Sequence, residues 1–226
     1  MTGGWPPPAP GSAETVRAAA LDSHDLEALA GRARGCTACP ELAATRTHVV
    51  PGAVPHGARL LVMGEAPGAQ EDERGLPFVG RSGQLLDLLL AEVGADRADV
   101  GVLNTVKCRP PANRPPTRAE SATCRGWTSR QLELAAPAVV VALGLSAARW
   151  FLGPGTLASL RGRLHQVHLS GVHLPGVHLP GVDLPGVGLL RVLPTYHPSA
   201  ALRHGPQGEP RRLLRDDLAL AVEASR

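Results

Sequence analysis

The stretch LLVMGEAPGAQED (residues 60–72) decides the fold of this chain. Its first four residues form an uninterrupted apolar run, which predicts a buried strand. The strand ends in a Gly/Pro-rich loop with Glu65 at its tip, and open α/β sheets bind their ligands at the carboxyl ends of strands. Phe78 follows in GLPFVG (75–80), where a ring among glycines suits stacking on a flat substrate. The stretch therefore predicts an α/β fold with a ligand site at this strand end.

Further apolar runs predict strands at residues 100–106, 138–143 and 189–193, besides the one at 59–64. Helical patterns occupy residues 23–33, 82–93, 146–151, 210–224 and a segment from Thr117, whose spacing to Glu120 matches a capping box. Strands that alternate with helices favour a parallel, doubly wound sheet.

Two polar residues follow other predicted strands in the way that Glu65 follows the first. Asn104 lies near the end of the second strand, and His197 comes shortly after the last one. Parallel strands place their carboxyl ends at one edge of the sheet. We therefore expect Glu65, Asn104 and His197 to lie together.

Composition limits the classes of protein that fit this chain. The 226 residues, 43% of them hydrophobic, are enough for one domain with a sizeable core. A net charge of +3 permits a nucleic-acid partner without requiring one. No apolar run approaches the ~20 residues of a membrane span, and the N-terminus lacks the pattern of a signal peptide. We expect a cytoplasmic protein.

Two segments depart from the α/β pattern. Residues 1–20 begin with a Pro/Gly/Ala-rich stretch and are predicted to be a disordered tail, which leaves residues 21–226 as a single domain. Residues 167–188 repeat the pentad Val-His-Leu-Ser/Pro-Gly, and a proline every fifth residue prevents a regular central strand. We interpret residues 167–188 as a loop whose histidines do not bind metal.

The chain has four cysteines: Cys36 and Cys39 in a C-x-x-C pair, then Cys108 and Cys124. Disulfides are rare in intracellular enzymes, so a bound metal is the favoured interpretation. Zinc ribbons usually have two tight knuckles, whereas the second pair here is widely spaced. Four cysteines also hold a [4Fe–4S] cluster, and spacing alone fits either metal.

Several motifs together resemble one known family. GEAPGAQED (64–72), GLPFVGRSG (75–83), NTVKCRPPANRPPT (104–117) and PTYHPSAALR (194–203) occur in order with the cysteines. The chain resembles the family 4, iron–sulfur uracil-DNA glycosylases over about residues 36–220. The resemblance implies a three-layer α/β/α fold with a central, mostly parallel four-stranded sheet. It also implies a [4Fe–4S] cluster on the four cysteines.

The resemblance implies excision of uracil from DNA by a monofunctional enzyme that hydrolyses the N-glycosidic bond and initiates base excision repair. The base would first be flipped out of the duplex. Glu65 would orient or activate the attacking water. His197 would hydrogen-bond the charge that develops on uracil O2.

The base itself would be read by a different set of residues. Phe78 would stack on the flipped ring. Asn104 offers one donor and one acceptor, which match O4 and N3–H of uracil and mismatch the amine of cytosine. Backbone groups from Gly64 to Ala66 would contact the base, and Glu71 is placed by the resemblance near the uracil C5 edge, where it would help to exclude thymine.

The expected partner is uracil-containing DNA, single- or double-stranded, bound by a monomer. Ser199 would bind a phosphate, Leu202 would enter the duplex as an apolar wedge, and Arg203 would lie near the backbone. Arg109 and Arg114, next to the expected cluster, are further candidates for phosphate contacts.

Alternative interpretations come from within the superfamily and from another class. A related branch captures uracil-DNA covalently through a histidine in the loop after the Asn motif, and this loop has none, so turnover is predicted. A related glycosylase with a broader range of deaminated bases is one alternative. Glu65 argues against the family 5 branch, which usually has an apolar residue there. A catalytically silent iron–sulfur DNA-binding module is disfavoured because Glu65, Asn104 and His197 are all present.

Overall fold

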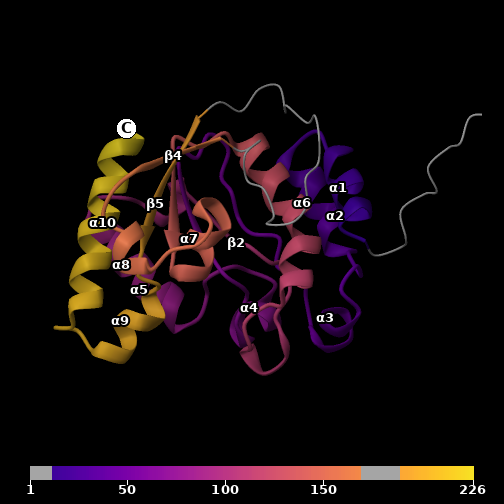
Figure 1. Ribbon diagram of the computed structural model, residues 1–226, viewed down its shortest axis with the longest axis horizontal. Coiled ribbons are helices and arrows are strands. Elements are labelled where there is room, and N and C mark those ends of the chain that lie inside the picture. Colours follow the sequence, from indigo (N-terminus) through magenta and orange to yellow (C-terminus); the bar gives the residue numbers. More distant parts are fainter. Residues whose placement is uncertain (1–11, 169–188) are drawn as a thin grey trace, which may run out of the picture.

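The structure of the chain is a computed structural model, and it describes residues 12–168 and 189–226. Its centre is a five-stranded sheet in the order β2-β1-β3-β5-β4 (Figure 1). The strands are β1 (Leu60–Gly64), β2 (Val100–Asn104), β3 (Val139–Leu143), β4 (His165–His168) and β5 (Leu189–Thr195). All neighbours pair in parallel except β4, which is antiparallel to β5. The carboxyl ends of β1, β2, β3 and β5 therefore meet at one edge of the sheet.

Helices cover both faces of this sheet. Their bounds are α1 (Ala13–Leu21), α2 (Leu26–Arg34), α3 (Pro40–Thr45), α4 (Ala69–Arg74), α5 (Arg81–Glu92), α6 (Arg118–Ala135), α7 (Leu145–Leu152), α8 (Leu157–Leu160), α9 (Pro198–His204) and α10 (Glu209–Ser225), with 3₁₀ turns η1 (Arg97–Asp99) and η2 (Pro111–Asn113).

Two hydrophobic clusters fix which helices lie on which face. Successive strand residues point to opposite faces. Val62 and its neighbours pack against α5, α9 and α10, whereas Met63 and its neighbours pack against α6 and α7 (Figure 1). Every residue of β1, β2 and β3 is buried, as expected for strands covered on both faces. The predicted three-layer, mostly parallel α/β fold is confirmed.

The sheet has one strand more than the four predicted. β4 pairs with β5 from His168 opposite Leu189 to His165 opposite Val192. It is short, polar and only partly buried, so it lacks the apolar run from which the central strands were predicted. β4 also contains Val167 and His168, so the predicted repeat loop cannot begin at residue 167. The rest of that loop lies outside the described residues.

The N-terminal segment is also more ordered than predicted. Helix α1 begins at Ala13, capped by Ser12 Oγ, which accepts a hydrogen bond from Thr15 N at 3.2 Å. α1 and α2 pack against α6, with Val16 and Ala20 buried beside Trp127. The predicted disordered tail is therefore wrong for residues 13–20, and residues 1–11 lie outside the described part.

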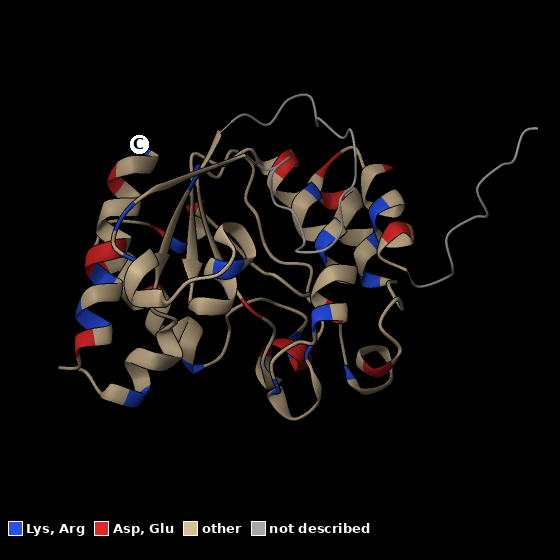
Figure 2. Cartoon of the chain, in the orientation of Figure 1, with Lys and Arg blue, Asp and Glu red and all other residues tan. Residues whose placement is uncertain are grey.

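Local signals at the helix ends were predicted in part. The capping box of α6 is confirmed, since Thr117 Oγ1 accepts from Glu120 N at 3.1 Å and Glu120 Oε2 accepts from Thr117 N at 2.7 Å. The sequence favours Ser82 as the N-cap of α5, and this prediction is wrong, because the helix begins at Arg81 after Gly80. Figure 2 shows charges of both signs along α10, the pattern of a solvated helix face.

Within the described ranges, no helix is both long and apolar enough to cross a membrane.

Candidate active site

The carboxyl edge of the sheet opens into a cleft of about 870 Å³, within the range of ligand sites in proteins. Glu65 follows β1, Asn104 ends β2, and His197 follows β5; all three side chains line the cleft together with Phe78. The sequence predicted that these strand ends would meet, and the structure brings them together. A carboxylate, an amide, an imidazole and an aromatic ring therefore share one concave surface.

Glu65 is held by its backbone, and its carboxylate is left free. Its carbonyl oxygen accepts hydrogen bonds from Val106 N at 3.1 Å and from Thr105 Oγ1 at 2.7 Å. Within residues 12–168 and 189–226 the carboxylate has no hydrogen bond or ion pair. The backbone of Glu65 is thus held in place while its carboxylate has no partner within those ranges. The carboxylate can therefore bind a water or stabilise a developing positive charge.

Asn104 is buried beside Gly64, its partner in the β1–β2 register. Its side chain is 2% exposed, and the part of the chain that the structure describes offers its amide no hydrogen-bond partner. A Cβ built on Gly64 would lie 2.5 Å from Asn104 Oδ1 and 2.7 Å from Phe78 Cζ. Only glycine at position 64 therefore leaves the space between the amide and the ring open.

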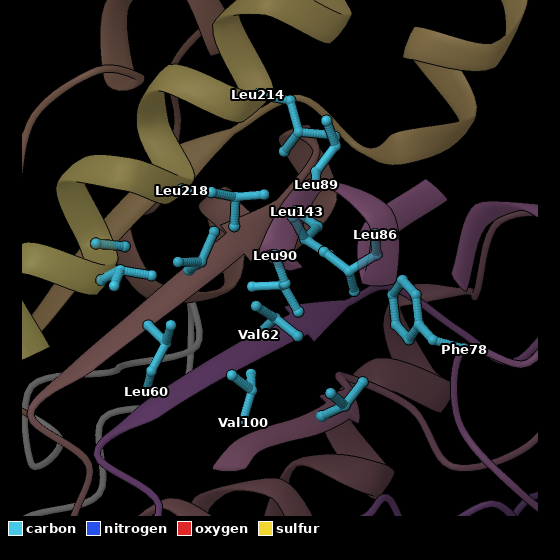
Figure 3. Close-up of a cluster of buried hydrophobic side chains, with 14 of the residues drawn as sticks. Leu60, Val62, Phe78, Leu86, Leu89, Leu90, Val100, Leu143, Leu214 and Leu218 are labelled. Carbon is cyan, nitrogen blue, oxygen red and sulfur yellow. The ribbon is translucent and has the colours of Figure 1, made fainter. Parts of the chain in front are cut away.

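The Phe78 ring is presented by a strained backbone. Phe78 has φ +53°, a left-handed conformation that aromatic residues rarely adopt and that costs on the order of 1–3 kcal/mol. Glu71 holds the flanking loop, because Oε1 accepts from Val79 N at 2.9 Å and Gly80 N at 2.8 Å, while Oε2 accepts from Gly68 N at 3.1 Å. The ring packs on the edge of the core and remains in the cleft (Figure 3).

His197 has a defined tautomer. It is the N-cap of α9, and its Nδ1 accepts a hydrogen bond from Ser199 N at 3.1 Å. Because a backbone N–H can only donate, Nδ1 carries no proton, and a neutral ring must carry its proton on Nε2. Burial, and to a smaller extent the Arg203 charge, lower the pKa of His197 to about 4, with Glu71 acting in the opposite direction. His197 is therefore a neutral N–H donor at physiological pH.

The residues predicted to contact DNA differ from one another in their exposure and in the partners that they already bind. Ser199 Oγ lies 2.9 Å from His197 Nδ1, and Arg203 lines the cleft. Leu202 is 36% exposed on α9. Arg109 donates to Asn113 Oδ1 at 2.7 Å. Arg114 lines the cleft too, but its guanidinium is paired with Glu120 at 2.8 Å and Glu41 at 3.2 Å, so a phosphate would compete with two carboxylates.

One wall of the cleft was not predicted from sequence. The turn between β3 and α7 contributes Leu143, Gly144 and Ser146, and Tyr196 lies next to it. Gly144 has φ +87°, and its N–H donates to the Thr195 carbonyl at 2.8 Å, which fixes this turn beside the His197 segment. One sequence signal could have predicted this wall: β3, like the other strands, ends in a glycine-containing turn at the same edge of the sheet.

A second, largely enclosed cavity is lined by all four cysteines. None of the four is in a disulfide. Burial raises the pKa of Cys39 and Cys108 to about 11 and that of Cys124 to about 12, and neighbouring cysteines add to each effect. Four thiols that are costly to ionise without a cation fit the donor set that a metal centre requires.

Hydrogen-bond donors surround these sulfurs. Lys107 N donates to Cys124 Sγ at 3.2 Å, and Arg46 Nη1 donates to Cys108 Sγ at 3.5 Å. Trp127 also lines the cavity, and its buried Nε1 has no partner among the described residues. Positive and polar N–H groups around sulfur are suited to a metal centre that carries negative charge on its thiolates.

The four cysteines line one cavity of about 10 Å³. Within the described ranges, no three His, Cys, Asp or Glu side chains are grouped so as to hold a metal ion. The thiol chemistry and the shared cavity, rather than a preformed coordination geometry, are what fit a metal centre here.

Comparisons with known proteins agree on one superfamily. Residues 51–219 match the model of the "Uracil DNA glycosylase superfamily". A "Type-4 uracil-DNA glycosylase" of Thermotoga maritima is 39% identical over 87% of this chain and 92% of its own length. Another from Archaeoglobus fulgidus is 36% identical over 79% and 84%. A "Type-5 uracil-DNA glycosylase" of Thermus thermophilus is 36% identical over 53% of this chain and 68% of its own length.

Proposed function

The chain belongs to the uracil DNA glycosylase superfamily, with type-4 enzymes among its relatives, and on that premise we propose how its cleft excises uracil from DNA. The reaction is hydrolysis of the N-glycosidic bond, the step that initiates base excision repair. The observation that carries the proposal is the convergence of Glu65, Asn104 and His197 from three strand ends onto one cleft.

Recognition requires the base to leave the stack, because its reacting bond is not accessible within the duplex. The Phe78 ring stacks on the flipped uracil. Asn104 Oδ1 accepts N3–H, and its side-chain N–H donates to O4. Cytosine presents an amine and an unprotonated N3 at these places, so both contacts would be lost. Backbone groups of Gly64 and Ala66 complete the pocket.

Bond cleavage places negative charge on the base and positive charge on the sugar. The C1′–N1 bond breaks with its electron pair on uracil, and His197 Nε2–H donates to O2 as charge develops there. The carboxylate of Glu65 stabilises the oxocarbenium-like sugar and orients the water whose oxygen bonds to C1′. The proton released by this water passes to Glu65 and balances the uracil anion.

The remaining residues hold the DNA and the base edge. Glu71 fixes the loop at the C5 edge of uracil, where a thymine methyl group is excluded. Ser199 and Arg203 contact phosphates, and Leu202 on α9 fills the space that the base leaves. Arg109 and Arg114 add phosphate contacts on the cluster side. The protein acts as a cytoplasmic monomer.

The proposal is tested by incubating the protein with a uracil-containing oligonucleotide and cleaving abasic sites with alkali. We expect product from uracil and far less product, measurable only at high enzyme concentration, from the matched thymine or cytosine oligonucleotide. A hypoxanthine oligonucleotide measures the range of bases. Protein with its metal centre intact that yields no product from uracil, on single or double strands, would contradict the proposed activity.

Gly64→Ala tests the pocket at its narrowest point. The added methyl group would overlap Asn104 Oδ1 and Phe78 Cζ, so we expect the space for a base to close. The carboxyl end of β1 should remain buried, so the fold should persist. A misplacement of about 1 Å can cost about 10²-fold in rate, and we expect a loss of this order in kcat/KM. Gly31→Ala on α2 is the comparison variant, because nothing lies within 4 Å of its Cβ and its backbone is helical. Equal activities in both variants would contradict the pocket.

We further propose that Cys36, Cys39, Cys108 and Cys124 hold a [4Fe–4S] cluster. Support comes from the cavity that the four cysteines share and from the N–H groups that donate to Cys108 and Cys124. Cys36 and Cys39 beside the start of α3, Cys108 in the loop after Asn104 and Cys124 on α6 would hold the cluster, which would tie these segments together without a redox role. The other residues perform the reaction described above.

Purified protein is expected to be brown and to hold about four iron atoms per chain. Removal of iron by a chelator should bleach the colour and lower Tm, because metal binding contributes to folding free energy. Cys124→Ser should show the same loss of colour. Colourless protein with stoichiometric zinc would contradict the cluster.

A further inference from the structure

The only lysine of the chain lies between the two cavities. Lys107 is 1% exposed and lines the cysteine cavity. Its Nζ donates to the carbonyl oxygen of Asn104 at 2.8 Å, and its backbone N donates to Cys124 Sγ at 3.2 Å. One residue therefore contacts both a predicted cluster ligand and the residue that reads the base.

A buried ammonium requires compensation, because removing a charge from water costs several kcal/mol. The observed partner of the ammonium is the Asn104 carbonyl, and the thiolates that would hold the proposed cluster would add negative charge in the cavity that Lys107 lines. An arginine head group is larger and planar, whereas an ammonium is compact. All other Lys or Arg positions of the chain are arginine. Lys107 is thus the one place where a compact ammonium lies between the cysteine cavity and Asn104.

The carbonyl of Asn104 depends on this contact. Asn104 is the last residue of β2, and the next backbone N–H, that of Thr105, donates to Gly64. The Asn104 oxygen accepts from Lys107 at 2.8 Å and from Thr128 Oγ1 at 3.4 Å. Lys107 is the closer donor, so it sets the peptide plane from which the Asn104 side chain projects into the cleft.

We propose that Lys107 is a positioning residue that couples the metal centre to base recognition: its backbone N–H binds the Cys124 sulfur, and its ammonium holds the carbonyl of Asn104. The inference rests on the proposed function, in which Asn104 reads uracil. Its consequence is that damage to this link impairs the choice of base even in molecules that keep their cluster.

Lys107→Met tests the link with a side chain of similar length that cannot donate. Arg46→Met is the comparison variant, because Arg46 donates to Cys108 Sγ but has no contact with Asn104. Three quantities are measured on each purified protein: iron per chain, the Kd for free uracil by calorimetry, and the ratio of kcat/KM on uracil to that on cytosine.

Per iron-loaded molecule, we expect Lys107→Met to weaken uracil binding and lower the uracil/cytosine ratio about 10- to 100-fold, as for a misplaced catalytic group. Arg46→Met should lose iron more readily and keep the wild-type ratio. Equal ratios in the two variants, or wild-type uracil affinity in Lys107→Met, would overturn the inference. Wild-type protein that leaves uracil in DNA would instead overturn the proposed function.

A second variant covers the case in which Lys107→Met does not fold, as judged by circular dichroism. Thr128→Val removes a hydroxyl that lies 3.0 Å from the Thr105 carbonyl and 3.4 Å from the Asn104 carbonyl, and it keeps the shape of the side chain. We expect it to lower the uracil/cytosine ratio in the same direction by a smaller factor, with full iron content. An unchanged ratio in folded Thr128→Val, together with unfolded Lys107→Met, would overturn the inference.

Discussion

His197→Ala is expected to lower kcat on uracil-containing DNA about 10²–10³-fold, the usual cost of losing one preorganised donor to a developing anion. The change should appear in kcat more than in KM, because the charge on uracil O2 exists in the transition state and not in the bound substrate. Single-turnover kinetics with enzyme in excess would measure the chemical step directly. A loss confined to KM would contradict the role of His197.

The same residue predicts a dependence of stability on pH. The pKa of His197 is lowered by burial to about 4 from an ordinary value of 6.5. Between these values the unfolded chain binds a proton that the folded chain does not, so stability falls as pH decreases from 6.5 to 4. In His197→Ala this contribution is absent, and urea unfolding at several pH values should show a smaller decline. Parallel declines in the two proteins would contradict a buried, neutral imidazole.

Glu65→Gln is expected to lower kcat about 10²–10⁴-fold, the range for loss of a general base. The amide is nearly isosteric with the carboxylate, so the hydrogen bonds to the Glu65 carbonyl should persist. It can neither take a proton from water nor stabilise a cationic sugar. Binding of free uracil should therefore remain at the wild-type level while turnover is lost.

The matched control is Glu73→Gln on α4, which removes an exposed carboxylate close to the same loop. This variant should keep wild-type kcat, because Glu73 does not line the cleft. Glu65→Gln with activity within about tenfold of the wild type would show that Glu65 is not the general base, since the expected loss is larger.

The sequence predicted the central sheet because buried parallel strands have continuous apolar runs. Val100–Asn104 and Val139–Leu143 are such runs, and the strand ends followed from them. β4 was missed because an edge strand has little apolar surface to bury. Helix α1 was missed because its stability comes from packing against Trp127, which lies more than a hundred residues later.

The candidate site was predictable where a side chain carries the chemistry and not where the backbone does. Glu65, Asn104 and His197 are polar residues after apolar runs, which makes them visible in the sequence. Gly144 contributes a turn and a peptide group to the cleft, which composition does not reveal. Nor could the sequence predict that Ser199 N would fix the tautomer of His197, because that contact requires the first turn of α9.

The position of β4 has a consequence for how this gene can vary. His168 pairs with Leu189 at the amino end of β5, and the cleft lies beyond Thr195 at the other end of that strand, about 20 Å away at about 3.3 Å per residue. Residues 169–188 thus connect His168 to Leu189, two paired residues that lie far from the cleft. Lengthening this connection by one pentad would raise the cost of closing it by only about 0.2 kcal/mol. A change in the number of pentads would therefore leave the opposite end of the same strand, next to the cleft, in place.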